Sequence, residues 1–162
     1  MTESGARVTR VALCALDVQP CNGCFGCWTT RPGECLVDDD ARRLTAQAIA
    51  SDLLAVATPA RFGTWGSVAK SALDRMIGLL LPHFVRIRGE VHHAPRYARY
   101  PRLIALGTLP AANPTCEALF ARLLARNALN FHCPAHAAAI VTDGDDAWAV
   151  ARRLVHARAV PA

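Results

Sequence analysis

Three short apolar runs, each stopped by a proline, a polar turn or a glycine, constrain this chain most. They are DLLAVATP, RLIALGT and HAAAIVT, and each is short enough to be a strand buried on both faces of a sheet. A fourth segment, RVTRVALCALDV, mixes β-branched and apolar residues and also reads as a strand. The predicted strands cover 7–18, 52–59, 102–108 and 136–142.

Helical segments separate these runs, with polar caps and apolar residues at helical spacing. The acidic triplet 38–40 supplies an N-cap for the first, and Asn113-Pro114 has the N-cap and N1 pattern of another. The predicted helices cover 40–51, 67–81, 114–127 and 145–158. Alternation of strand and helix is typical of α/β proteins with right-handed crossovers. The 162 residues are therefore expected to form one domain, a parallel sheet of about four strands with helices on both faces.

Two stretches do not fit the alternation. Residues 19–38 are rich in Cys, Gly and Pro, which predicts an irregular loop. Residues 82–101 contain three prolines and several His and Arg, and are predicted to form a long irregular lid or interface segment.

The net charge of +5 comes almost entirely from arginine, since Lys70 is the only lysine among 18 basic residues. No run of basic residues is longer than two, so we expect no nucleic-acid partner. No apolar run is long enough for a bilayer and the first residues lack a secretory signal pattern. A cytoplasmic protein without a membrane partner is expected.

Four of the seven cysteines lie within fifteen residues, which points to metal or redox chemistry rather than a disulfide framework. Compact Cys-x2-Cys-x2-Cys runs suit a [4Fe–4S] cluster. Zinc, a redox thiol pair and ordinary packed cysteines are the alternatives. Cys14 and Cys116 are expected in the core, and Cys133 between two histidines is a weak metal candidate. The four candidate ligands are Cys21, Cys24, Cys27 and Cys35.

Two loops follow predicted parallel strands at the edge where ligands of α/β sheets bind. Both carry glycines for close backbone approach, and the first adds aromatic residues and an arginine, so a planar ring could lie against them. The alternative is that Phe62 and Trp65 only cap the core. On the helix that follows, Asp74 and Arg75 are expected to be a solvated pair. The candidate cofactor residues are Pro59, Ala60, Arg61, Phe62, Gly63, Thr64, Trp65, Gly107 and Thr108.

Taken together, the segments PCNGCFGCW, ATPARFGTWGSVAKSALDR and LGT resemble the NAD(P)H-dependent FMN reductase family, and most closely its iron–sulfur flavoprotein branch. The resemblance runs over roughly 5–145. It implies a flavodoxin-like three-layer fold, FMN held by the two loops, NAD(P)H as reductant and a cluster on the four cysteines. It also implies a homo-oligomer formed through 68–100.

The chain departs from that family in two ways. It lacks the Gly-Ser-Pro-Arg type of loop that holds the FMN phosphate, and its opening aligns with the family's second strand. The first strand is therefore expected to be missing. Three explanations are open: the sequence as given begins too late, strand 7–18 moves inward, or a partner fills the gap. Arg61 stands where relatives often have an aromatic residue.

The leading functional prediction is an FMN-dependent NAD(P)H oxidoreductase that passes electrons to a small molecule or a protein, with no side chain nominated as catalytic acid or base. The alternative is a non-catalytic metal-binding or electron-carrier module on a degenerate flavodoxin-like scaffold. A third is a regulatory protein that docks a partner through 82–101.

Overall fold

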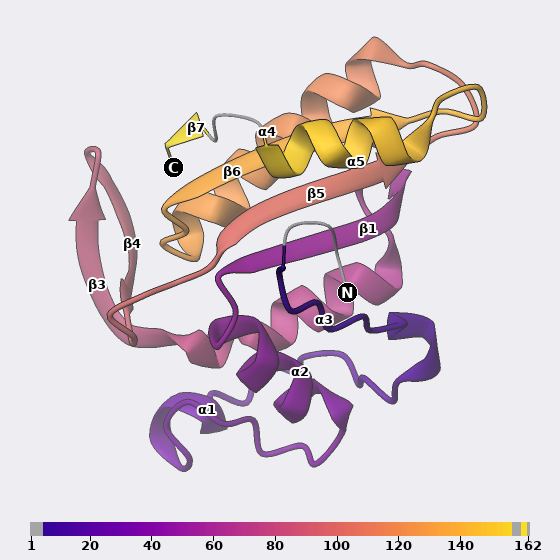
Figure 1. Ribbon diagram of the computed structural model, residues 1–162. Helices are drawn as coiled ribbons and strands as arrows, with labels where there is room; N and C mark the ends of the chain where they lie inside the picture. The colour runs from indigo at the N-terminus through magenta and orange to yellow at the C-terminus, as the bar shows by residue number, and fades with distance from the viewer. Residues whose placement is uncertain (1–4, 157–159, 162) are drawn as a thin grey trace.

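The computed structural model describes residues 5–156 and 160–161, and its centre is a mixed sheet (Figure 1). Three parallel strands form the middle: β1 (Leu53–Arg61), β5 (Arg102–Thr108) and β6 (Ala135–Val141). Short antiparallel strands flank them in the order β2-β1-β5-β6-β7, where β2 is Thr64–Trp65 and β7 is Val160–Pro161. The α/β class and the three central parallel strands are confirmed.

The central strand β5 has parallel partners on both sides, as its apolar sequence predicts. Its residues Leu103, Ile104 and Ala105 are at most 6% exposed. It is in register with β1 from Leu53↔Arg102 to Pro59↔Thr108, so the two strands end side by side at the same edge of the sheet.

Helices connect the strands and begin at side-chain caps. The Asp39 carboxylate accepts a hydrogen bond from the Ala41 amide at the start of α2, and Asn113 caps α4 in the same way. The core lies between the sheet and these helices around Phe120, Leu103 and Leu124. No helix within 5–156 has the length and apolar character needed to cross a bilayer. The helices are α1 (Gly26–Thr29), α2 (Asp40–Ile49), α3 (Ser67–Asp74), α4 (Pro114–Asn130) and α5 (Ala147–His156).

Helices α4 and α5 pack against β5 and β6 from opposite faces, so this half of the sheet is a middle layer (Figure 1). The β1 half is covered on one face only. Along β1, Ala55, Ala57 and Pro59 are exposed, while Thr58 and Ala60 on the other face are buried. Beyond its pairing with β5, this strand pairs, among residues 5–156 and 160–161, only at Ala60 and Arg61, with β2.

The predicted strand over 7–18 is wrong. This segment is irregular apart from one 3-10 turn, η1 (Leu13–Ala15), and joins neither sheet. It lies beside α3 instead, where Leu13 and Val18 pack against the core. The described chain therefore has three central parallel strands rather than four, and segment 7–18 has not moved inward to pair with β1.

The predicted irregular segment over 82–101 is also wrong for most of its length. It forms an antiparallel hairpin of β3 (Leu80–Ile87) and β4 (Glu90–Pro95), which stands apart from the main sheet (Figure 1). Arg88 and Gly89 both have positive φ, the two-residue turn geometry that suits the twist of a hairpin. The predicted helix over 67–81 ends earlier, because the chain tightens into the 3-10 helix η2 (Arg75–Leu79) and then enters β3.

Candidate functional site

The four cysteines of the compact run line one cavity of about 670 Å³. Cys27 lies on the short helix α1, Cys21 and Cys24 lie in the loop before it, and Cys35 lies in the loop that returns to α2. All four are free thiols: the first two in sequence are exposed, and Cys27 and Cys35 are half-buried. The structure therefore brings together the four residues that the spacing predicted as ligands.

Unusual backbone conformations bend the loop around this cavity. Gly23 and Gly33 have φ of +68° and +91°, and Phe25 adopts a left-handed conformation at the start of α1. Gly26 is required for packing, since a Cβ there would lie 2.3 Å from the Leu36 side chain. Glycine at such positions permits a turn that other residues would resist.

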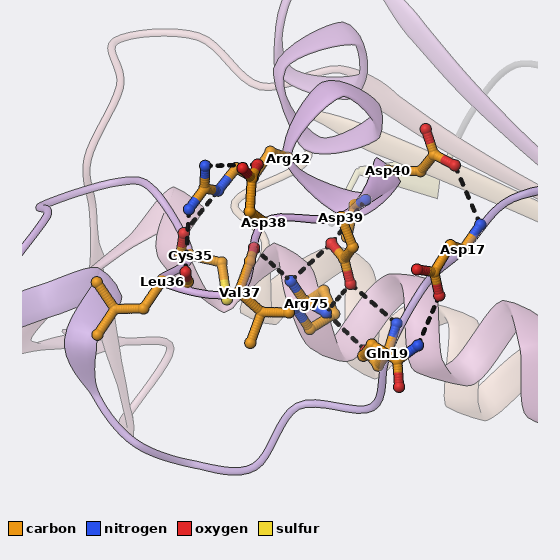
Figure 2. A network of polar contacts seen from close by, with 11 residues as sticks. Asp17, Gln19, Cys35, Leu36, Val37, Asp38, Asp39, Asp40, Arg42 and Arg75 are labelled. Carbon is orange, nitrogen blue, oxygen red and sulfur yellow. Dashed lines mark hydrogen bonds and ion pairs between the residues drawn. The ribbon is translucent and has the colours of Figure 1, made fainter.

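The two ends of the cysteine loop are fastened to each other by one arginine and one aspartate (Figure 2). Arg75 donates from Nη1 to the carbonyl of Gln19 at 2.7 Å and from Nη2 to the carbonyl of Val37 at 3.4 Å. Asp39 accepts from the Gln19 amide at 2.9 Å. Residues 19 and 37 bracket the four thiols, so these contacts set the span of the loop.

Arg75 and Asp39 also form a buried ion pair with two short contacts, 2.6 Å from Nη1 to Oδ2 and 2.9 Å from Nη2 to Oδ1. Both side chains are 1% exposed. Burial alone would raise the pKa of Asp39, but hydrogen bonds from Arg75 and from the Gln19 and Ala41 amides outweigh it, and the pKa is lowered. The expected solvated pair of Asp74 and Arg75 is wrong, because Arg75 points inward to a partner 36 residues away.

The thiols influence one another. Burial raises the pKa of Cys27, and so does its proximity to Cys35, Cys21 and Cys24. Within the described residues, no three His, Cys, Asp or Glu side chains converge on a point where they could hold one metal ion. The four thiols thus share the wall of one cavity.

The rest of the cavity wall is mainly apolar and comes from η2, β3, α3 and α4. Trp28 donates from its indole to the carbonyl of Leu80 at 2.9 Å, which ties α1 to β3. Trp65 donates to the Asn127 side chain at 2.7 Å and meets Phe120 edge-to-face. The lining side chains beyond the cysteines include Phe25, Trp28, Trp65, Lys70, Leu73, Asp74, Arg75, Ile77, Leu123, Asn127 and Phe131.

The two predicted cofactor loops lie next to each other, because Pro59 is in register with Thr108. Their inner side is closed by the protein itself: a Cβ at Gly63 would lie 2.6 Å from Leu119, and one at Gly107 would lie 2.4 Å from Ile140.

The outer side of these loops is open. Phe62 is 92% exposed, so it does not cap the core, whereas Trp65 at 4% does. Arg61 is also exposed. Of the predicted cofactor residues, Thr64 and Trp65 alone are among the residues that line the cysteine cavity.

The remaining cysteines stand apart from this site. Cys133 is buried, and burial raises its pKa to about 12. Its neighbour His132 bonds the carbonyl of His93 instead of turning toward it. Cys116 is half-buried, and Cys14 is exposed, so the expectation of a core position is wrong for Cys14.

Sequence reasoning missed Arg75 and the part of α4 that faces the cavity, including Leu123, Asn127 and Phe131. The acidic triplet at 38–40 was a usable signal, because three adjacent carboxylates offer a partner for a buried arginine. Asp39 is the one that pairs with Arg75. Nothing in the sequence of α4 marks Asn127 as a wall of a site formed by residues 21–35.

Comparisons with family models, with curated proteins and with solved structures return no match for this chain.

Proposed function

We propose that this chain is an electron-transfer protein that holds a [4Fe–4S] cluster on Cys21, Cys24, Cys27 and Cys35. The observation that carries the proposal is the grouping of these four thiols around one cavity. A cluster of this kind takes one thiolate per iron, and Cys-x2-Cys-x2-Cys spacing is typical of it.

The arrangement favours a cluster over zinc. Zinc bonds to sulfur at about 2.3 Å in a tetrahedron, which requires thiols about 3.8 Å apart around one point. Structural zinc sites more often pair two Cys-x2-Cys knuckles separated by a longer stretch, whereas three of these cysteines stand in one compact Cys-x2-Cys-x2-Cys run.

A bound cluster would supply reversible one-electron transfer, taking an electron from a reduced one-electron carrier and giving it to an oxidised one. The chain's own residues would hold it and shield it. Trp28, Leu80 and Ile77 form an apolar wall that keeps water from one side of the thiols. The exposed Cys21 and Cys24 lie on the open side, where a redox partner could approach.

The test is anaerobic reconstitution of the full chain with iron and sulfide, followed by electron paramagnetic resonance of the reduced protein. We expect a brown protein with a cluster signal. Cys27→Ala removes a ligand and should lose most of the iron, whereas Cys116→Ala, outside the site, should retain it. Equal iron in both variants would exclude the four-thiol site.

A flavin-dependent NAD(P)H oxidoreductase with a flavodoxin-like fold is the second candidate. Thr64 and Trp65, from the loop assigned to FMN by resemblance, share the cavity with the cysteines, whose volume and aromatic walls suit a planar ring. The phosphate fits less well, because the two cations in the wall are already paired, Lys70 with Asp74 and Arg75 with Asp39.

Titration with riboflavin and with FMN, followed by quenching of tryptophan fluorescence, tests this second candidate. If the cavity takes the ring and provides nothing for the phosphate, both ligands bind with similar affinity. Much tighter binding of FMN would show that a phosphate site exists. The absence of quenching with either ligand would exclude the flavin. The homo-oligomer expected through 68–100 belongs to the same hypothesis, and a sedimentation measurement would test it.

A further inference from the structure

Arg75 has one hydrogen-bond donor that the loop does not use. A guanidinium has five N–H donors. Four of them are directed to Asp39 and to the carbonyls of Gln19 and Val37. The fifth, on Nε, is buried and has no partner among the described residues. A buried donor left unsatisfied is destabilising, so an acceptor next to it would stabilise this arrangement.

The neighbouring group is the sulfur of Cys35. Arg75 and Cys35 line the same cavity, and the proximity of Cys35 contributes, after Asp39, to raising the pKa of Arg75. Figure 2 shows the Cys35 side chain next to Val37, whose carbonyl accepts a hydrogen bond from Arg75. The backbone of Cys35 is fixed independently, since its carbonyl accepts from Nε of Arg42 at 2.9 Å.

We propose that Arg75 is the positioning residue of the thiol site, with its Nε–H directed to the Cys35 sulfur when that sulfur is a cluster ligand. This inference rests on the proposed cluster. A neutral thiol accepts hydrogen bonds weakly, whereas a metal-bound thiolate carries negative charge and accepts well. Binding of the cluster thus satisfies the one donor that the protein leaves unpaired.

The consequence is electrostatic as well as structural. A hydrogen bond to a ligand sulfur and a nearby positive charge both favour the reduced cluster, because reduction adds negative charge. Asp39 opposes this effect, since its carboxylate compensates the charge of Arg75. Arg75 therefore raises the reduction potential, and Asp39 limits the increase.

The experiment is a redox titration of the reconstituted full chain, followed by electron paramagnetic resonance. Asp39→Asn keeps Arg75 but removes the compensating charge, so the potential should rise. The double variant Arg75→Met with Asp39→Asn loses the donor and both charges. Its ratio of oxidised to reduced cluster at a fixed potential should increase about tenfold relative to wild type, or about 59 mV for one electron.

A control outside the thiol site is Arg43→Met, which removes an exposed arginine paired with Asp40 at 3.0 Å. Its ratio of oxidised to reduced cluster at the same fixed potential should stay within twofold of the wild-type ratio. If Arg75 had a purely structural role, the reduction potentials of Asp39→Asn and of the double variant would shift in the same direction, or neither would shift. Either result overturns the inference while leaving the cluster in place.

The other outcomes are also decisive. If the double variant does not fold, an unchanged or lowered potential in Asp39→Asn alone overturns the inference. If the wild-type chain takes up no cluster, the proposed function fails together with this inference, and the wild-type result alone identifies that case.

Discussion

Replacing Arg75 with methionine removes the residue that fastens both ends of the cysteine loop. Methionine has a similar length and no charge, so the main loss is the ion pair with Asp39 and the bonds to Gln19 and Val37. Removing one partner of a buried pair costs about 3–5 kcal/mol, because the other charge is left uncompensated. Asp39 keeps the amides of Gln19 and Ala41 as donors, so we expect the loss at the lower end of this range, about 3 kcal/mol.

Urea denaturation followed by tryptophan fluorescence measures this loss. The matched control is Lys70→Met, on the same helical segment, where the lysine pairs with Asp74 in solvent and should contribute about 0.2–0.5 kcal/mol. Arg75→Met combined with Asp39→Asn should cost less than the sum of the single changes, since it leaves no buried charge. A loss in Arg75→Met no larger than that of Lys70→Met, or strict additivity in the double variant, would refute the reasoning.

Three further predictions follow from buried groups. The lowered pKa of Asp39 means that its ionised form stabilises the fold at neutral pH, and this contribution is lost as pH falls below 3.8; comparison with Asp39→Asn across an acid titration checks it. Cys133, with its pKa near 12, should resist a thiol reagent at neutral pH that modifies exposed Cys14 at once, as mass spectrometry would show. Gly107→Ala places a Cβ 2.4 Å from the nearest side-chain carbon and should cost about 1–3 kcal/mol, whereas Gly144→Ala meets nothing; thermal unfolding compares them.

The parallel strands and most helices could be predicted because local pattern determines them. The runs that became β1, β5 and β6 are apolar and bounded by breakers, and Asn113-Pro114 is a local helix start. The hairpin of β3 and β4 was missed for the opposite reason. Its prolines lie at the irregular start of β3 and the end of β4, where they do not interrupt most of the ladder, and its Arg88-Gly89 turn is a weak signal.

Segment 7–18 shows the limit of pattern alone. Its residues are compatible with a strand, but a strand also requires a partner edge, and this segment pairs with none in the described chain. The same limit applies to Arg75, whose spacing on a helix suggested solvent. Its burial depends on Asp39, a contact between distant parts of the sequence that no local pattern contains.

The sequence allowed us to predict which cysteines line the site, but not the shape of the cavity that they line. Spacing alone identified the four thiols that line the cavity. The apolar wall behind them comes from α4 and β3, which are distant in sequence, and the shape of the cavity follows from that packing.

The most direct test of the central claim is metal and acid-labile sulfide analysis of the wild-type chain purified without oxygen. We expect about four irons and about four sulfides per chain, bound together. One zinc per chain with no sulfide would contradict it, and so would a protein free of metal that remains so after reconstitution.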